Sequence, residues 1–170
     1  VRTIFNPVRM PAKSFHSCDS SNLLAIGRQD DQKNFSALLR IFQQLHRPDL
    51  VLTIVGKDYG TRQRLLEEAK YLKIDSKVKF VDFQSDVSEF YYHSAVFLLT
   101  SSYEGLPLVL IEAKAHGLPC ISFDCPTGPR HIINDGVDGF LIPMHDEPLM
   151  AQKVLHYLDD ANLQESMSRE

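Results

Sequence analysis

Short, unbroken apolar runs recur along the sequence, separated by glycines, prolines and polar segments. Such runs are typical of strands that are buried on both faces, because side chains pointing to either side of the sheet then meet packed helices. A half-exposed strand would instead alternate apolar and polar residues. The sequence therefore predicts strands of one parallel sheet at residues 22–27, 50–56, 78–81, 95–100, 119–123 and 139–143.

Between these runs the apolar residues follow helical spacing. Asn34 is placed to cap a helix whose apolar face is Phe35, Leu38, Leu39, Phe42 and Leu45. A second helix follows Thr61, shorter helices are predicted at residues 87–93 and 107–116, and a last helix carries Met150, Val154, Leu155 and Leu158. Strands that alternate with helices in this way indicate an α/β fold: a doubly wound, Rossmann-like parallel sheet of about six strands with helices on both faces.

Size and charge exclude several classes of protein. The chain has 170 residues, the usual length of one domain, and 44% of them are hydrophobic. A formal net charge of -4 offers no basic field to a nucleic-acid backbone, so nucleic acid is not expected as a partner. No apolar run reaches the roughly 18 residues of a membrane helix. Three cysteines without CxxC spacing favour reduced thiols in the cytoplasm: Cys18, Cys120 and Cys125.

The two ends of the chain differ from the rest. Residues 1–21 contain Pro7 and Pro11, show weaker periodicity, and are interpreted as a lead-in or linker from a missing N-terminal domain, with one strand at residues 2–5. Residues 22–170 form the predicted domain. The chain begins without methionine and stops within a predicted helix. We therefore expect both ends to be cut from a longer protein, with the C-terminal helix truncated.

In an open parallel sheet, ligands bind beyond the carboxyl ends of the strands. The first strand ends in Gly27 and Arg28, and Lys33 follows just before the next helix. Two cations beside a helix N-terminus favour an anion, because free backbone amides and the helix dipole attract negative charge there. These residues indicate a site for a diphosphate; the alternative is a pair of solvated surface cations.

Two carboxylates follow the fourth strand. Glu104 precedes the next helix and Glu112 lies within it, which would separate them by about 12 Å along a helix. That separation exceeds the roughly 5–9.5 Å of the carboxylate pairs that hydrolyse glycosides. Two carboxylates that hold separate hydroxyl-bearing parts of one long ligand are therefore the better interpretation. The alternative for Glu112 is a side chain turned to solvent.

Glycine-rich turns follow the fifth strand, at residues 124–130 and 134–139. Their glycines allow positive φ angles and a close approach of backbone to ligand, and turn chemistry alone explains them equally well. All histidines except His131 are scattered, with no second metal-binding or catalytic residue at a suitable spacing. They are interpreted as structural or surface residues: His16, His46, His93, His116, His145 and His156.

Together these segments resemble the nucleotide-binding C-terminal half of GT-B fold glycosyltransferases, specifically the large retaining family called group 1 or GT4. One such motif is weak, whereas the ordered set is specific and spans about residues 22–160. The matching segments are Gly27-Arg28 with Lys33-Asn34, LTIVG at 52–56, VKFV at 78–81, Glu104-x7-Glu112 followed by Ala113, Gly117-Leu118-Pro119-Cys120, and Asp135-Gly136 with Gly139-Phe140-Leu141.

The resemblance implies a role for each matched position. Arg28 and Lys33, beside Gly27, would neutralise the diphosphate of a nucleotide-sugar donor. Glu104 would contact hydroxyls of the transferred hexose, and with the two cations it forms the implied catalytic set. Glu112 would accept hydrogen bonds from the ribose.

The resemblance also implies donor contacts from the backbone around the next helix start, at Gly105, Leu106, Pro107 and Leu108. Phe83, in the loop after the third strand, would lie near the nucleobase. Two positions depart from the family pattern. Pro107 stands where many relatives have glycine, as in an EGLP subset that builds cell-surface polysaccharides. At the other position the family commonly has glutamate and this chain has a histidine, which we interpret as a surface or turn residue: His131.

The implied function is transfer of a hexose or N-acetylhexosamine, with retention, from a UDP-linked sugar to a glycan or lipid-linked acceptor in bacterial surface polysaccharide synthesis. Cations and a helix dipole would stabilise the departing diphosphate, so neither a metal nor another cofactor is expected. The acceptor would bind through the missing N-terminal domain, without which the fragment is expected to be inactive. The full-length enzyme would be cytoplasmic, with peripheral association at the inner face of the plasma membrane.

Several other classes share the strand–helix pattern. A dehydrogenase-type dinucleotide module is disfavoured because the first strand leads into GRQD at residues 27–30 rather than GxGxxG. A phosphoacceptor signalling domain is suggested by Asp30-Asp31, but residues 100–101 and 123–124 do not supply the further aspartate and lysine that it needs. A GT-B nucleotide-sugar epimerase and a non-catalytic nucleotide-binding α/β module remain alternatives.

Overall fold

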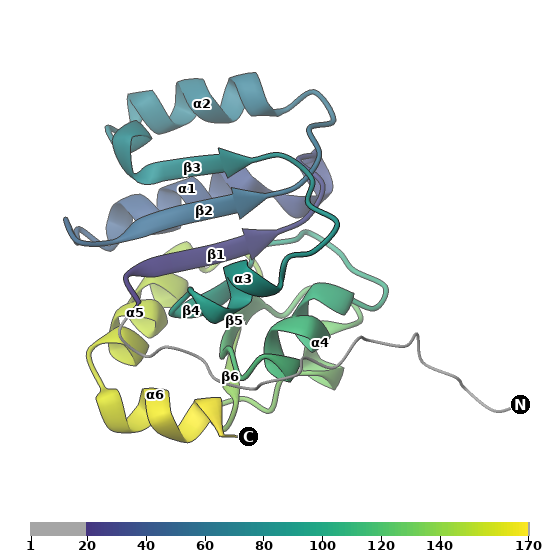
Figure 1. The fold of residues 1–170 in the computed structure, drawn as a ribbon, viewed down its shortest axis with the longest axis vertical. Coiled ribbons are helices and arrows are strands. Elements are labelled where there is room, and N and C mark those ends of the chain that lie inside the picture. Colours follow the sequence, from purple (N-terminus) through teal and green to yellow (C-terminus); the bar gives the residue numbers. More distant parts are fainter. Residues whose placement is uncertain (1–19, 170) are drawn as a thin grey trace, which may run out of the picture.

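A computed structural model describes residues 20–169, and within them six parallel strands form a single sheet in the order β3-β2-β1-β4-β5-β6 (Figure 1). Each strand agrees with its predicted apolar run to within one residue at either end, so the predicted fold class is confirmed. The linker assigned to residues 1–21 lies outside the described part of the chain except for its last two residues, and so does the strand predicted at residues 2–5. The strands are β1 (Asn22–Ile26), β2 (Val51–Val55), β3 (Val78–Val81), β4 (Val96–Leu99), β5 (Cys120–Phe123) and β6 (Gly139–Ile142).

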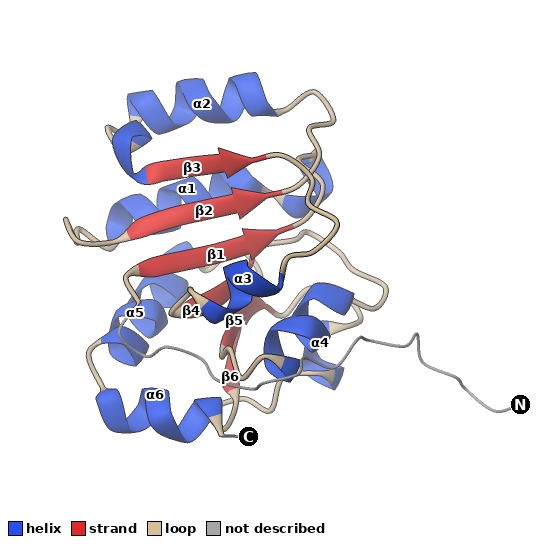
Figure 2. Ribbon diagram, viewed as in Figure 1, coloured by secondary structure: helices blue, strands red, loops and turns tan. Residues whose placement is uncertain are grey.

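Helices cover both faces of this sheet (Figure 2). On one face α1 (Phe35–Gln44), α2 (Arg62–Tyr71) and α5 (Glu147–Leu158) share a core cluster with the strands. On the other face α3 (Ser88–Tyr92) and α4 (Leu108–Ala115) contribute to a second cluster. The sheet is therefore the middle of three layers.

The side chains of the central strands alternate between the two clusters. In β1, Leu23 and Ala25 pack with the first cluster, whereas Leu24 packs with the second. In β4, Val96 packs with the first cluster and Phe97 with the second. All five side chains are buried. Both faces thus demand apolar residues, which is the physical reason for the unbroken runs in the sequence.

Two local predictions differ from the structure. Asn34 begins α1 in a left-handed conformation, with φ of 50°, and its side chain makes no capping hydrogen bond. The helical segment after residue 146 is two helices, because Asp160 accepts a hydrogen bond from the backbone of Leu163 and starts α6 (Ala161–Ser168). A residue that caps a new helix interrupts what the apolar spacing presents as one.

The carboxyl ends of β1, β2 and β3 are held close together at Gly56. Its backbone N–H donates to the carbonyl of Val81, and the N–H of Gly27 donates to the carbonyl of Val55. A Cβ atom on Gly56, which has φ of 152°, would lie 1.9 Å from the carbonyl oxygen of Gly27. Only glycine fits this close approach, which aligns the loops that leave the sheet.

Candidate functional site

The loops that leave β1, β4 and β5 form one connected edge. The N–H of Ser102 donates to the carbonyl of Gln32 at 2.9 Å, and the side-chain amide of Gln32 donates to the carbonyl of Tyr103 at 2.9 Å. The hydroxyl of Thr127 donates to the carbonyl of Glu104. The structure therefore brings together three of the segments that the sequence predicts as ligand-binding loops.

At this edge Lys33 and Glu104 form an ion pair. The Nζ atom of Lys33 lies 2.6 Å from Oε1 of Glu104, and the hydroxyl of Ser101 donates to the same oxygen at 2.6 Å. The side chains are 12% and 8% exposed. Gly27 makes room for the lysine, since a Cβ atom there would lie 2.8 Å from its Cε atom. Two predicted catalytic residues are thus in direct contact, and the buried charges compensate one another.

Arg28 lies further out, with 55% of its side chain exposed. Its Nε atom is 3.0 Å from a carboxylate oxygen of Asp30, and one of its terminal nitrogens donates to Gln32 at 2.8 Å. The guanidinium carbon lies 5.7 Å from the centre of the Tyr59 ring, within cation–π range. The alternative of solvated surface cations is therefore wrong for Lys33, whereas Arg28 is a surface cation held by three neighbours.

Backbone donors are available where α4 begins. Pro107 stands at the N-cap position, and no side chain caps this helix. The first amides of an uncapped helix can serve an anion or another hydrogen-bond acceptor. Gly105 is exposed, and a Cβ atom there would meet nothing within 4 Å. Leu106 and Leu108 are half-buried beside it. The structure brings these four predicted positions to the same edge as the Lys33–Glu104 pair.

The loop after β5 packs against this helix start. Thr127 and Gly128 are consecutive residues with positive φ angles, 58° and 86°. A Cβ atom on Gly128 would lie 2.6 Å from Cδ of Pro107 and 3.2 Å from the carbonyl oxygen of Gly105. The predicted positive φ is confirmed at Gly128, and the turn supports the backbone of the helix start.

The second glycine-rich turn has a structural explanation. Asp138, which is buried, accepts hydrogen bonds from Nζ of Lys114 at 2.5 Å and from the backbone and side-chain amides of Asn134 at 3.0 and 2.8 Å. Gly136 has φ of 76°, as turn chemistry predicts. This turn therefore ties α4 to the segment before β6. His131 lies in a short 3-10 turn and is exposed, so the surface assignment is confirmed.

Glu112 lies on α4 and is half-buried rather than turned fully to solvent. The hydroxyl of Tyr91 donates to its Oε2 atom at 3.0 Å, and its backbone carbonyl lies 2.7 Å from Nδ1 of His116. Burial, followed by the nearby carboxylate, raises the pKa of Tyr91. The hydroxyl therefore keeps its proton and serves as a donor.

Phe83 follows β3 and is 69% exposed, so its ring is available to a ligand. The ion pair of Asp82 with Arg62, at 2.7 Å, fixes the base of this loop. Sequence reasoning missed Arg62 and its partner Gln29, a fully buried amide that accepts from Arg62 Nε and donates to the carbonyl of Gly56, both at 2.8 Å. The only available signal for Gln29 was its place in a strand-end loop.

Two further findings concern the described residues alone. Between residues 20 and 169, no group of three or more histidine, cysteine, aspartate or glutamate side chains could hold a metal ion. In the same part of the chain, none of the helices combines the length and the hydropathy needed to cross a membrane.

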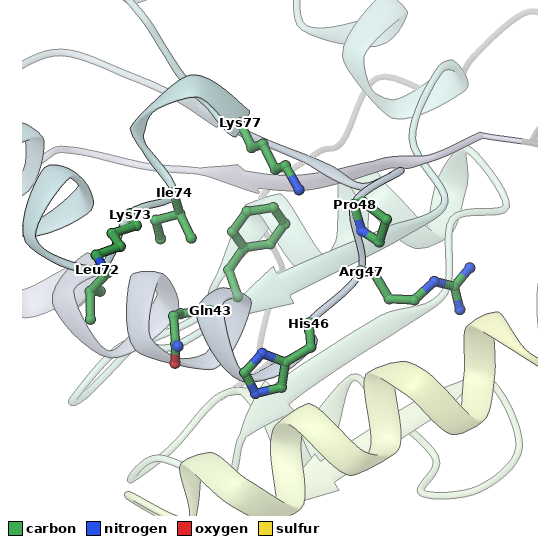
Figure 3. A pocket seen from close by; sticks show the side chains of 9 residues that line it. Gln43, His46, Arg47, Pro48, Leu72, Lys73, Ile74 and Lys77 are labelled. Atoms are coloured by element: carbon green, nitrogen blue, oxygen red, sulfur yellow. The ribbon is translucent and has the colours of Figure 1, made fainter.

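A cavity of about 290 Å³ lies away from this edge, where α1 and α2 end (Figure 3). Its cationic lining has local explanations. His46 and Lys73 follow the ends of these helices with positive φ angles, 50° and 58°, as is common just past a helix end, and the charge of Lys73 complements the helix dipole. Arg47 points away toward α5 in Figure 3 and is paired with Asp49 and Asp159. The described residues that line this cavity include no carboxylate, so the cavity has no ion pair like that of Lys33 with Glu104.

Comparison with solved structures identifies the three-layer fold as the Rossmann-like half of a GT-B glycosyltransferase. TarM from S. aureus, solved with UDP, has a TM-score of 0.92 over 99% of this chain and 34% of its own, at 22% identity. The pneumococcal O-GlcNAc transferase GtfA, solved with UDP and GlcNAc, has a TM-score of 0.74 over 95% of this chain and 35% of its own, at 28% identity.

Sequence comparison places the chain in a particular family. Residues 9–170 match the glycosyl transferases group 1 family, and the chain belongs to it. The amylovoran biosynthesis glycosyltransferase AmsD of Erwinia amylovora is 38% identical over 149 residues, which are 88% of this chain and 42% of AmsD. The lipopolysaccharide 1,6-galactosyltransferase of Escherichia coli is 31% identical over 152 residues, which cover 83% of this chain and 41% of that enzyme. The chain thus spans less than half the length of these relatives.

Proposed function

We propose that this chain is the donor-binding domain of a retaining glycosyltransferase. It would take a hexose or N-acetylhexosamine from a UDP-sugar and pass it to a glycan or lipid-linked acceptor in bacterial surface polysaccharide synthesis. The observation that carries the proposal is the Lys33–Glu104 pair, which lies beside Gly27 and the uncapped start of α4.

The names of the relatives support the choice of substrates. AmsD takes part in amylovoran biosynthesis, and the Escherichia coli enzyme transfers galactose in lipopolysaccharide. A relative from Campylobacter jejuni, 29% identical over 144 residues, transfers N-acetylgalactosamine to a saccharide linked to diphospho-undecaprenol. These names cover both kinds of sugar and both kinds of acceptor in the proposal.

In the proposed mechanism, Lys33 and Arg28 neutralise the diphosphate as the bond from the anomeric carbon to its oxygen breaks. A bond forms to the acceptor hydroxyl oxygen, and the proton of that hydroxyl passes to the departing diphosphate. A phosphate that engages Lys33 competes with Glu104, whose carboxylate then becomes available to the sugar hydroxyls. Each charge-assisted contact would contribute about 1.5–3 kcal/mol.

The remaining donor groups have complementary roles. The backbone of Gly105 and Leu106 and the start of α4 at Pro107 and Leu108 would face the phosphate and the sugar. Glu112 would accept hydrogen bonds from the ribose, and Phe83 would lie near the nucleobase. Preorganised positive charge stabilises the leaving group in this scheme, so we propose that the reaction needs no metal.

The acceptor site would lie in an N-terminal domain outside this chain. We propose that transfer requires this domain and that the chain without it binds donor but has no activity. The complete enzyme would act in the cytoplasm, in peripheral contact with the inner face of the plasma membrane, where a lipid-linked acceptor is within reach.

Calorimetric titration tests this proposal. The ligands would be UDP, UDP-glucose, UDP-N-acetylglucosamine, GDP-mannose and NAD, each with EDTA and again with magnesium. Saturable binding of the UDP compounds that is unchanged by EDTA would support it, and an Arg47→Ala variant at the opposite edge should bind like wild type. Binding of NAD alone would contradict the donor assignment, and binding that requires magnesium would contradict metal independence. Product analysis with the complete enzyme separates transfer from epimerisation.

A further inference from the structure

A buried tyrosine on α3 makes a direct hydrogen bond to the carboxylate proposed to hold the ribose. Tyr91 is 1% exposed, and its hydroxyl donates to Oε2 of Glu112 at 3.0 Å. The carbonyl oxygen of Val109 lies 3.4 Å from the same hydroxyl. The ring stacks on His116, with 4.9 Å between centres and 28° between planes, and lies 6.0 Å from the ring of Phe97. The hydroxyl is therefore a fixed point in the core.

His116 completes this arrangement from the end of α4. It is 4% exposed, and its Nδ1 atom lies 2.7 Å from the backbone carbonyl of Glu112. Because a carbonyl only accepts hydrogen bonds, Nδ1 carries a hydrogen in this contact, and Nε2 is the other polar atom of the ring. That buried Nε2 atom meets no partner in the residues that the structure describes. The ring thus holds the turn that carries Glu112 and supports the tyrosine ring.

Within residues 20–169, one oxygen of the Glu112 carboxylate accepts a hydrogen bond and the other does not. Oε2 of Glu112 is engaged by Tyr91, while no hydrogen bond reaches Oε1 from the described chain. A half-buried glutamate without such a donor would sample several rotamers, and binding would have to order it. With the donor in place, the free oxygen is presented before any ligand arrives.

We propose that Tyr91 is a positioning residue, which orients the Glu112 carboxylate toward the ribose hydroxyls of the donor. This inference rests on the proposed function, because it deepens the role assigned there to Glu112. Tyr91 itself does not touch the donor. Its effect should therefore depend on the ribose hydroxyls, and it should vanish for a nucleotide that lacks them.

The test compares UDP with 2′,3′-dideoxy-UDP by calorimetry on Tyr91→Phe, which keeps the ring and removes the hydroxyl. Wild type should bind UDP at least about tenfold more tightly than the dideoxy compound, as loss of a hydrogen bond to a charged group predicts. In Tyr91→Phe, UDP affinity should fall about fivefold or more while dideoxy-UDP affinity stays within about twofold. The matched control is Tyr71→Phe, since Tyr71 is 85% exposed on α2 and should leave both affinities unchanged.

Several results with the Tyr91→Phe variant would overturn the inference. Equal weakening of both ligands by Tyr91→Phe would mean a structural role only, and unchanged affinity for both would mean none, so either overturns the inference. The ratio of the two affinities is internal to each variant, which keeps the comparison valid if thermal unfolding shows some loss of stability. In a Glu112→Ala background, Tyr91→Phe should have no further effect, and an additional loss would also overturn it. Failure of wild type to bind UDP would instead refute the proposed function, and this inference with it.

Discussion

Replacing Lys33 by methionine should lower both the stability of the domain and its affinity for UDP, and the two effects can be separated. Methionine keeps much of the aliphatic length beside Gly27 but removes the ammonium. Glu104, only 8% exposed, would then keep the hydroxyl of Ser101 as its hydrogen-bond donor and lose its counter-charge. A buried carboxylate without a counter-charge destabilises the folded state.

The size of this effect follows from the burial of the pair. Breaking one partner of a buried ion pair costs about 3–5 kcal/mol. Ser101 still donates to Glu104, and water reaches the partly exposed side of the pair, so we expect about 2–3 kcal/mol for Lys33→Met. In a domain of this size that corresponds to a fall in melting temperature of about 4–12 °C. The double variant Lys33→Met/Glu104→Gln also removes the unpaired negative charge of Glu104. Its free energy of unfolding should recover to within about 1 kcal/mol of wild type.

Urea unfolding measures the stability, and calorimetry measures the binding of UDP. Both variants should bind UDP at least about tenfold more weakly, because the lost charge-assisted contact does not return with stability. Lys70→Met, on the exposed face of α2, is the matched control and should change neither quantity. The reasoning would be refuted by a Lys33→Met protein as stable as the control, or by a double variant no more stable than the single one.

Three further results are expected. Arg28→Ala and Glu112→Gln should each weaken UDP binding by about tenfold with unchanged far-UV circular dichroism, since one charge-assisted contact is lost in each; unchanged affinity in both would contradict the site. Gly128→Ala should lower the free energy of unfolding in urea by about 2 kcal/mol, because a Cβ atom would strain a φ of 86° and lie 2.6 Å from Cδ of Pro107; wild-type stability would contradict this. Burial raises the pKa of Cys125 to about 11, so its thiol stays protonated at pH 8. It should react with iodoacetamide slowly at that pH, with a rate that rises toward pH 11. Peptide mass spectrometry that shows labelling at the rate of a free thiol would contradict this expectation.

The strands of the sheet could be predicted because burial on both faces restricts the residues of each strand to apolar types. A strand such as β4, whose residues Val96 to Leu99 are all buried, needs apolar side chains on both faces, and that need is visible in the run itself. The limits of α6 could not be predicted in the same way. One aspartate, Asp160, ends the apparent continuity of the last helical segment, and apolar spacing carries no information about whether a capping bond forms.

The candidate site was predictable in outline for a similar reason. Parallel strands present their carboxyl ends at one edge, so Gly27, Lys33 and Glu104 could be assigned to that edge from their places after strands. The side-chain contacts that support this edge could not be predicted. Gln29 and Arg62 are 33 positions apart and meet across two loops, and no periodicity of a single sequence relates residues at that separation.

The order and spacing of residues along the chain thus specify a doubly wound sheet and the edge where a ligand would bind, because both depend on local hydrophobic patterning and on strand direction. The pairing of charges at that edge depends on how the loops pack in space. Packing leaves Arg28 at the surface, buries Lys33 against Glu104, and directs the hydroxyl of Tyr91 to Glu112, 21 positions further along the chain. Such contacts depend on side-chain burial and loop geometry, which arise only when the layers of the domain have come together.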